Sequence, residues 1–199
     1  MSIQARRERE RAERERLIVT AAREMAEADG WEAVTTRRLA ERVEYSQPVL
    51  YSHFKGKDAI MAAVAVEGFA DLAAEMRAAR ESASTPEQAL ADVAAAYIAF
   101  AERRPALYDA MFNQSVSLPF ATPDAPPALH AGFDELRQVV RPVAEDDEVD
   151  LLAEVLWSGL HGLVTLTRGG RLPREHHEHR LALLLRRLAH WGDTSQVSG

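Results

Sequence analysis

Cysteine is absent from the 199-residue sequence, which excludes disulfide bonds, thiolate catalysis and redox sensing through thiols. No strand-like alternation and no internal repeat is visible, so the pattern predicts an all-α protein. The sequence also lacks a nucleophile elbow, a phosphate loop and paired carboxylates in a catalytic context. We therefore expect neither an enzyme nor a bound cofactor.

A membrane span and a metal site are not expected either. The most apolar run, residues 151–167, is interrupted by Glu154 and His161 and is too short for a bilayer, so we interpret it as a buried helix. The charged N-terminus is unlike a signal peptide, and we expect a cytoplasmic protein. His176 and His179 form an i,i+3 pair with no third ligand in view, which favours a solvated helix face over a metal site.

Residues 35–57 carry the most informative pattern, which predicts two short helices around a tight turn. Leu39, Ala40 and Val43 give the first helix an apolar face, and the second has Val49, Leu50 and Phe54. Residues 44–46 are long enough only for a turn. Ser46 is a favourable N-cap, and Pro48 fits the first helical turn, where its missing N–H costs nothing.

With these core faces assigned, the remaining side chains combine hydrogen-bonding groups and cations, as a DNA recognition helix requires. We expect Gln47 and Tyr51 to contact bases or the groove, and we assign Thr36, Ser46, His53, Lys55 and Lys57 mainly to phosphates. Arg37 and Pro48 complete the predicted DNA-binding surface, and Ser52 also points outward. The alternative is a small helical hairpin with a polar face.

This segment resembles the DNA-binding domain of tetracycline-repressor-type (TetR) transcriptional regulators. The matching pieces, AAREMAEADGWEAVTTRRLAERV and SQPVLYSHFKGKDAI, lie between residues 16 and 64, about a quarter of the chain. One departure is visible in the turn, where the family usually has a glycine followed by an aliphatic residue. Here Glu44 and Tyr45 occupy these positions, and glycine is favoured there because it tolerates positive φ. Glu44 is therefore expected to adopt a different or mildly strained turn.

The charge distribution fits DNA binding although the net charge is −7. Residues 1–57 contain 12 Lys and Arg against 10 Asp and Glu, whereas residues 58–199 contain 12 against 21. A basic end on an acidic body directs one part of the molecule toward phosphates.

The N-terminal segment Arg6–Arg16 interleaves arginine and glutamate. Its i,i+4 and i,i+3 pairs would stabilise a solvated helix. Two interpretations stay open: a frayed tail, or an extension in which Arg6, Arg7 or Arg9 reaches phosphates. A core helix is then expected with Leu17, Ala21, Met25 and Ala28 on one face, ending at Gly30, with Trp31 and Val34 packed under the two short helices.

Two domains are predicted: residues 1–60 for DNA binding, and residues 61–199 for ligand binding and dimerisation. Helices are expected at about 58–83, 86–103, 106–112, 128–143, 149–167 and 174–191, with a proline-rich loop at 115–127. The last two helices have broad apolar faces, which suggests cover by a second subunit. The resemblance likewise implies a homodimer that places two recognition helices on a palindromic operator of double-stranded DNA.

The second domain is expected to bind a small, largely apolar or aromatic effector. Residues 157–162 (WSGLHG) resemble the Trp-x-x-x-His-Gly signature of one TetR C-terminal subtype, and i,i+4 spacing puts Trp157 and His161 on one helix face. The opposite wall of the predicted pocket is formed by Tyr97, Phe100, Tyr108, Met111 and Phe112. The alternative is that these side chains are core.

The observations predict a ligand-responsive repressor, and the resemblance to TetR-type regulators implies that its effector releases it from DNA. The alternatives are an architectural DNA-binding protein without effector, an activator or co-repressor-dependent regulator, and an enzyme that has kept a helix-turn-helix fold.

Overall fold

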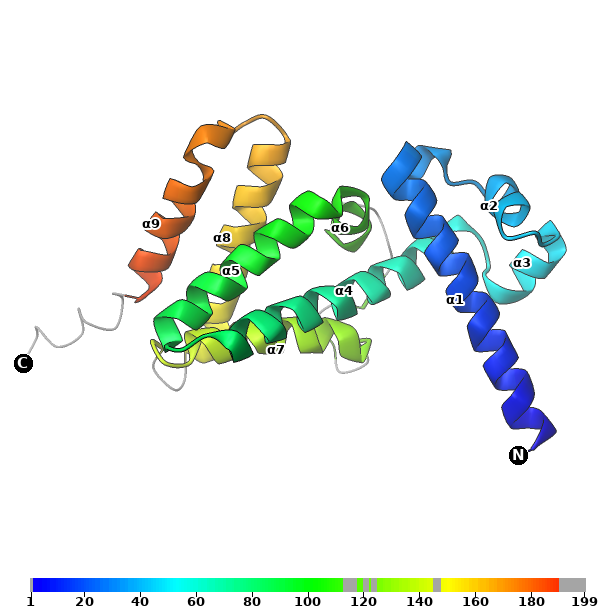
Figure 1. Ribbon diagram of the computed structural model, residues 1–199, viewed down its shortest axis with the longest axis horizontal. Helices are drawn as coiled ribbons and strands as arrows, with labels where there is room; N and C mark the ends of the chain where they lie inside the picture. Colours follow the sequence, from blue (N-terminus) through cyan, green and yellow to red (C-terminus); the bar gives the residue numbers. More distant parts are fainter. Residues whose placement is uncertain (1, 113–117, 120–121, 123–124, 145–147, 190–199) are drawn as a thin grey trace, which may run out of the picture. The chain divides into compact units, whose positions relative to one another are not determined.

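The computed structural model describes residues 2–112, 118–119, 122, 125–144 and 148–189. The described residues form nine α-helices and two short 3-10 helices and no strand, which confirms the all-α fold class (Figure 1). The chain divides into two compact units. The first comprises residues 1–69 and 104–126, and the second comprises residues 70–103 and 127–199.

This grouping differs from the division expected after residue 60, because residues 104–126 join the first unit. Within that unit, Glu27 accepts hydrogen bonds from the backbone N–H groups of Ala106 (3.2 Å) and Leu107 (2.9 Å). These N–H groups lie in the first turn of α6 (Pro105–Phe112), where a helix has no acceptors of its own and favours an anion. The indole of Trp31 also donates to the Ala106 carbonyl at 2.7 Å. Both contacts join positions more than 70 residues apart, so local sequence patterns could not reveal them.

The first unit begins with α1 (Ile3–Asp29), followed by η1 (Trp31–Ala33), α2 (Thr36–Arg42) and α3 (Gln47–His53). Gly30 ends α1 at φ +80° as expected. The buried face of α1 includes Ala21 and Met25, but the expected Leu17 and Ala28 are exposed. The core instead takes a face centred on Ile18 and Ala22, and α1 contacts η1, α2, α3 and α6.

The helix α4 (Lys57–Ser82) belongs to both units. The second unit continues with α5 (Pro86–Arg103), α7 (Pro127–Val140), α8 (Val149–Arg168), η2 (Arg174–His176) and α9 (His177–Ala189). Within it α5 contacts α7, α8 and α9. The bounds of α5 agree with the helix expected at 86–103. Its apolar stripe is buried, namely Leu90, Val93, Ala94, Tyr97, Ile98 and Ala101. Thr85 accepts a hydrogen bond from the Gln88 N–H at 3.2 Å, which fixes the start of this helix.

Among helices of the described residues, α8 alone is long and apolar enough, by length and composition, to cross a membrane. It has 20 residues, more than the apolar run suggested, but only 28% of its most apolar window is buried. Ala153, Leu156 and Leu160 are buried completely, whereas Leu151 and Val155 remain 62% and 53% exposed. The expectation of a buried helix is therefore right for one face and wrong for the other.

Candidate nucleic-acid interface

The two short helices, α2 and α3, meet at a turn whose backbone is unusual. Val43 closes α2, and the Tyr45 N–H donates to the Ala40 carbonyl at 2.9 Å. Between them Glu44 has φ +57°, the only positive φ of a non-glycine residue among those described. The turn therefore keeps the left-handed conformation that suits glycine, at a steric cost to the glutamate.

The core beneath this turn is formed as expected by Leu39, Ala40, Val43 and Leu50, which are all buried, while Phe54 is half-buried. Trp31 and Val34 are buried in the same unit. Val49 was expected in this core but is 38% exposed. It lies one residue before Leu50 on α3, and a helix with its Leu50 side packed inward must turn the preceding residue outward.

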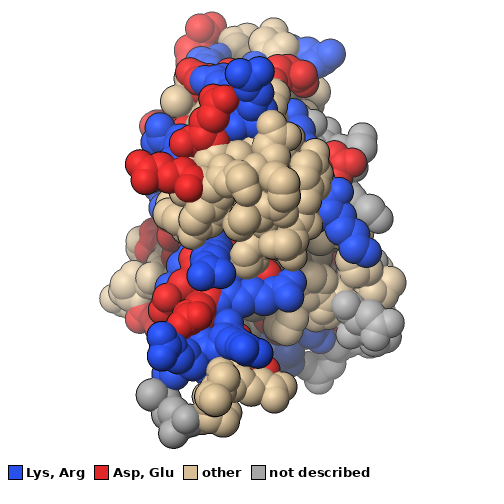
Figure 2. All heavy atoms as spheres, turned by 90° about the vertical axis from the view of Figure 1, so that its right-hand side faces the viewer, with Lys and Arg blue, Asp and Glu red and all other residues tan. Residues whose placement is uncertain are grey.

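Most of the predicted DNA-binding side chains are exposed on α3, on the residues that flank it, or on α2. They are Arg37, Ser46, Gln47, Pro48, Tyr51 and Lys55. Ser46 is the N-cap residue, but its hydroxyl makes no capping hydrogen bond, so it is available to an outside partner. Tyr51 is 50% exposed, and its hydroxyl lies 3.5 Å from the hydroxyl of Thr36, which is half-buried on α2. Figure 2 shows an uncharged area on this side of the molecule, flanked by charged side chains.

His53 was expected to point outward, and this orientation is wrong. Its side chain is only 7% exposed, and Nδ1 lies 3.3 Å from the carboxylate of Glu15 on α1. The Arg11 guanidinium also binds that carboxylate at 2.8 Å. The hydrogen bond from Arg11 lowers the pKa of Glu15, and the contact with His53 acts in the same direction. His53 thus attaches α3 to α1.

Lys57 is likewise engaged within the unit. It is half-buried at the start of α4, and its ammonium donates to the Trp31 carbonyl at 2.6 Å. An ammonium has three donors, so this bond leaves others available, but it fixes the side chain. A backbone acceptor 26 residues away was not visible in the sequence pattern.

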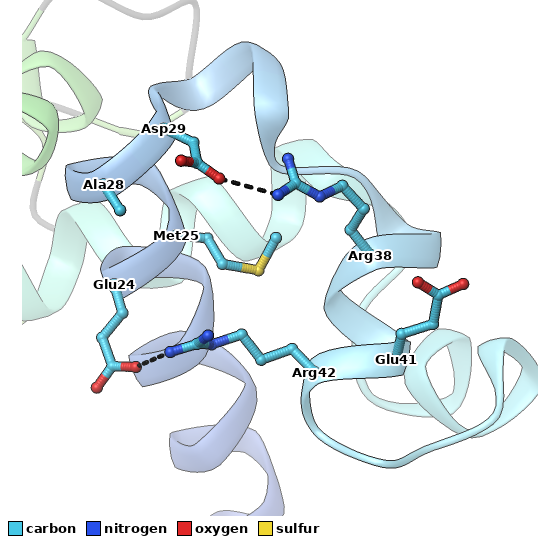
Figure 3. Close-up of a pocket in the computed structure, with 7 residues that line it drawn as sticks. All are labelled: Glu24, Met25, Ala28, Asp29, Arg38, Glu41 and Arg42. Atoms are coloured by element: carbon cyan, nitrogen blue, oxygen red, sulfur yellow. Dashed lines mark hydrogen bonds and ion pairs between the residues drawn. The ribbon is translucent and has the colours of Figure 1, made fainter.

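A pocket of about 490 Å³ lies between α1 and α2 (Figure 3). Two ion pairs cross it: Arg38 with Asp29 and Arg42 with Glu24, each at 2.9 Å. Met25 and Ala28 form its apolar part. Since both cations are already paired with acids of α1, the arrangement attaches α2 to α1 and offers no unpaired charge to a ligand.

The predicted effector residues fall in both units. In the second unit, Tyr97 and Phe100 on α5 are buried, and the Trp157 indole donates to the Tyr97 hydroxyl at 3.2 Å. His161 lies one turn further along α8, with Nε2 at 3.4 Å from the Thr165 hydroxyl. Burial lowers the pKa of His161, which favours the neutral ring. The hydrogen bond between Trp157 and Tyr97 therefore joins α8 to α5.

Tyr108, Met111 and Phe112 belong to the first unit, on α6. Tyr108 and Met111 are buried, and Phe112 contacts the rings of Tyr108 (4.7 Å between centroids) and Phe69 (5.1 Å). A β-carbon placed on Gly68 would meet the Met111 sulfur at 2.7 Å. Such close packing favours a core role for the α6 side chains.

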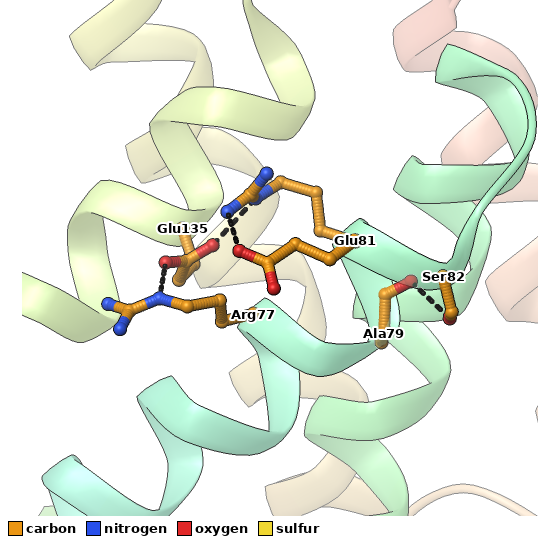
Figure 4. A network of polar contacts seen from close by, with 6 residues as sticks. Arg77, Ala79, Glu81, Ser82 and Glu135 are labelled. Atoms are coloured by element: carbon orange, nitrogen blue, oxygen red, sulfur yellow. Dashed lines mark hydrogen bonds and ion pairs between the residues drawn. The ribbon is translucent and has the colours of Figure 1, made fainter.

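One buried charge, that of Glu135, was not predicted from the sequence. Glu135 on α7 is 1% exposed and accepts hydrogen bonds from Arg77 (2.8 Å) and Arg80 (2.7 Å) of α4 (Figure 4). Arg80 also pairs with Glu81 at 3.4 Å. The available signal was the position of Glu135 beside Leu136 on the apolar stripe of its helix, where a carboxylate needs a cationic partner.

The geometry of the first unit defines a helix-turn-helix protein: a buried Leu50, a seven-residue helix exposed on its other side, and a short turn with a left-handed residue. Two family models match the chain. "Bacterial regulatory proteins, tetR family" covers residues 18–64, and "Tetracyclin repressor-like, C-terminal domain" covers residues 90–189, half of the sequence. The chain belongs to the TetR family of transcriptional regulators. The Trp-x-x-x-His-Gly subtype stays a prediction.

Individual relatives agree with this assignment. The HTH-type transcriptional regulator YobS of Bacillus subtilis is 33% identical over 96 residues, which span 48% of this chain and 50% of YobS. The match thus covers about half the length of that relative. A solved structure of a protein of unknown function from Rhodococcus sp. RHA1 superposes with a TM-score of 0.73 at 26% identity, covering 88% of this chain and 93% of the other.

A TetR variant from Acinetobacter baumannii AYE, solved in complex with minocycline, shares the fold. Its TM-score is 0.65 at 17% identity, with 91% of this chain and 97% of the other covered.

Proposed function

We propose that this regulator is a cytoplasmic, non-enzymatic repressor that binds a palindromic operator as a homodimer and is released by a small, largely apolar effector. The observation that carries the DNA-binding part is the two-sided character of α3. Leu50 is buried, while Gln47, Tyr51 and the uncapped Ser46 hydroxyl are exposed. A recognition helix needs this division, because one side must be fixed to the protein and the other must reach base edges.

Within this surface the residue types divide into two roles. Gln47 at the start of α3 has the amide that pairs with adenine, and Tyr51 one turn later supplies a ring and a hydroxyl to the groove. Thr36, Arg37, Ser46 and Lys55 are suited to phosphates, and Pro48 to contact with the groove wall. Lys57 would reach a phosphate with the donors that Trp31 leaves unused. His53 supports α3 through Glu15 in this proposal.

Dimer formation is supported by the exposed side of α8 and α9. Leu151, Val155 and Leu166 on α8 and Leu183 on α9 are 40–62% exposed, and large apolar side chains gathered on one surface are typical of a protein–protein contact. A second copy would cover it with the same surface around a two-fold axis. Two recognition helices would then read half-sites about 34 Å apart, or a multiple of that distance.

For the effector, we propose a site in the second unit near Tyr97, Phe100, Trp157 and His161. The neutral imidazole and the Trp157–Tyr97 pair offer a few polar groups among apolar ones, as orienting groups in ligand pockets do. The minocycline complex of the Acinetobacter relative supports the idea that such a fold holds a small molecule. Binding would release DNA by favouring a position of α4 that mismatches the half-sites, with a coupling of about 1–3 kcal/mol.

The test is a binding selection of purified protein on random duplex DNA at one physiological salt concentration. We expect a palindrome with regular half-site spacing. Gln47→Ala should relax discrimination at one position of each half-site, by about 1–3 kcal/mol per base pair. The matched control is Gln138→Ala, the same change at an exposed position of α7 in the second unit.

Sequence-blind binding by the wild type would favour the architectural alternative. Equal losses by Gln47→Ala on all duplexes would reject direct readout by this side chain. A small molecule that strengthens operator binding would favour the co-repressor alternative over release.

A further inference from the structure

The N-terminal half of α1 forms a charged helical arm, which we define as residues 3–16. It is part of one continuous helix, Ile3–Asp29, and at 1.5 Å per residue it extends about 20 Å beyond the first buried residue, Ile18. Figure 1 shows the N-terminus of α1 lying past α2 and α3. Ion pairs Arg6–Glu10 and Arg11–Glu15, both 2.8 Å, support the helix.

Helical spacing divides the arm's arginines into two sets. Arg7, Arg11 and Arg14 precede Ile18 by eleven, seven and four residues, so they continue the side of α1 on which Ile18, Ala22 and Met25 are buried. Arg6, Arg9 and Arg16 lie on the other side. The contact of Glu15 with His53 fixes this orientation, because it places the neighbouring turn of the arm against the end of α3.

The cations on the α3 side are available to an outside anion. Arg7 and Arg14 are exposed and form no ion pair with another described residue, and the side chain of Arg11 is 62% exposed while it pairs with Glu15. Glu15, the acid that contacts α3 through His53, is already bound by Arg11 as well. Basic side chains also gather on the lower part of the face seen in Figure 2, below its uncharged area.

We propose that the arm lies along the phosphate backbone beside the groove read by α3 and binds phosphates through Arg7, Arg11 and Arg14. The three arginines recur at intervals of about one helical turn along this stretch, as an extended series of phosphates requires. The inference rests on the proposed function. This set replaces the sequence-based candidates Arg6, Arg7 or Arg9, because the helical phase selects a different face. The continuous helix from Ile3 argues against a frayed tail. The surface adds affinity without base readout.

The test compares two double variants that remove the same charge from opposite sides of the arm. Arg7→Ala with Arg14→Ala acts on the α3 side, and Arg9→Ala with Arg16→Ala acts on the other side. Binding to the selected duplex and to a scrambled duplex is measured from 50 to 200 mM salt, and circular dichroism checks that both variants keep the helix.

We expect the first pair to flatten the plot of log K against log salt by about 0.9 for each lost phosphate contact, hence about 1.8 per arm. The ratio of affinities for the two duplexes should stay unchanged, and the second pair should behave as the wild type. If the wild type selects a palindrome but both double variants change the salt slope equally, or neither changes it, the arm does not contact phosphates as proposed. Failure of the wild type to bind any duplex would overturn the proposed function as well.

Discussion

Glu44 adopts a backbone conformation that its side chain disfavours. Its φ of +57° places the β-carbon close to the following carbonyl. Replacing Glu44 with glycine removes that clash but also makes the unfolded chain more flexible, so the two effects partly cancel. We expect Glu44→Gly to raise the free energy of unfolding by about 0.5–1 kcal/mol, measured by urea denaturation.

Glu44→Ala is the matched control, because it removes the same carboxylate but keeps the β-carbon. It should leave the stability within about 0.5 kcal/mol of the wild type. An equal gain in both variants would assign the effect to charge and contradict the strain.

The two short helices on either side of Glu44 show how far residue spacing can predict a site. Leu39, Ala40, Val43 and Leu50 could be placed in the core because their spacing is helical and they are apolar. On α3, however, spacing alone put Val49 inward and His53 outward, and both were wrong. A seven-residue helix has too few turns to fix its phase, and the group that draws His53 inward is Glu15, 38 residues earlier.

At the scale of elements, Glu135 connects α7 to the end of α4. Its carboxylate is 1% exposed and accepts from two guanidinium groups, so a neutral amide would weaken two charge-assisted hydrogen bonds in a buried place. We expect Glu135→Gln to lower the free energy of unfolding by about 1–3 kcal/mol. Thermal and urea denaturation both measure this change.

Glu81→Gln tests the outer part of the same network. Glu81 is 60% exposed and lies 3.4 Å from Arg80, and an exposed pair contributes at most about 1 kcal/mol. A loss as large as that of Glu135→Gln would show that the whole cluster, rather than the buried carboxylate, stabilises the second unit.

Element bounds could be predicted where the signals are local. The cap at Thr85 and the apolar spacing of residues 86–103 gave α5 its limits. The grouping of the helices into two units could not be predicted in the same way. The helix α6 joins the first unit through Glu27 and Trp31, and the partners of these residues lie more than 70 residues away in the sequence. The buried partners of Glu135, 55 and 58 residues away, are equally invisible to local spacing.

At the scale of the whole molecule, α8 has one buried apolar face and a second apolar face that is exposed. Leu151, Val155 and Leu166 recur every four or eleven residues and stay exposed, and a β-carbon on Gly162, within the same stripe, would meet nothing within 4 Å. A second subunit packed on this stripe would bury it and leave room for close helix contact at Gly162. The sequence suggested this from the width of the apolar face.

If the stripe is the dimer interface, one charge placed within it should separate the subunits. Val155→Glu would bury a carboxylate without a partner, twice in a symmetric interface, and each burial is strongly unfavourable. We expect this variant to sediment as a monomer where the wild type is a dimer, and to lose about 100-fold or more in operator affinity, because the two half-sites are then bound independently.

The control is Ala95→Glu, the same charge at an exposed position of α5, which should stay dimeric and keep its affinity. A Val155→Glu protein that remains a dimer would move the interface to another surface, and the half-site spacing argued from α8 and α9 would fail with it.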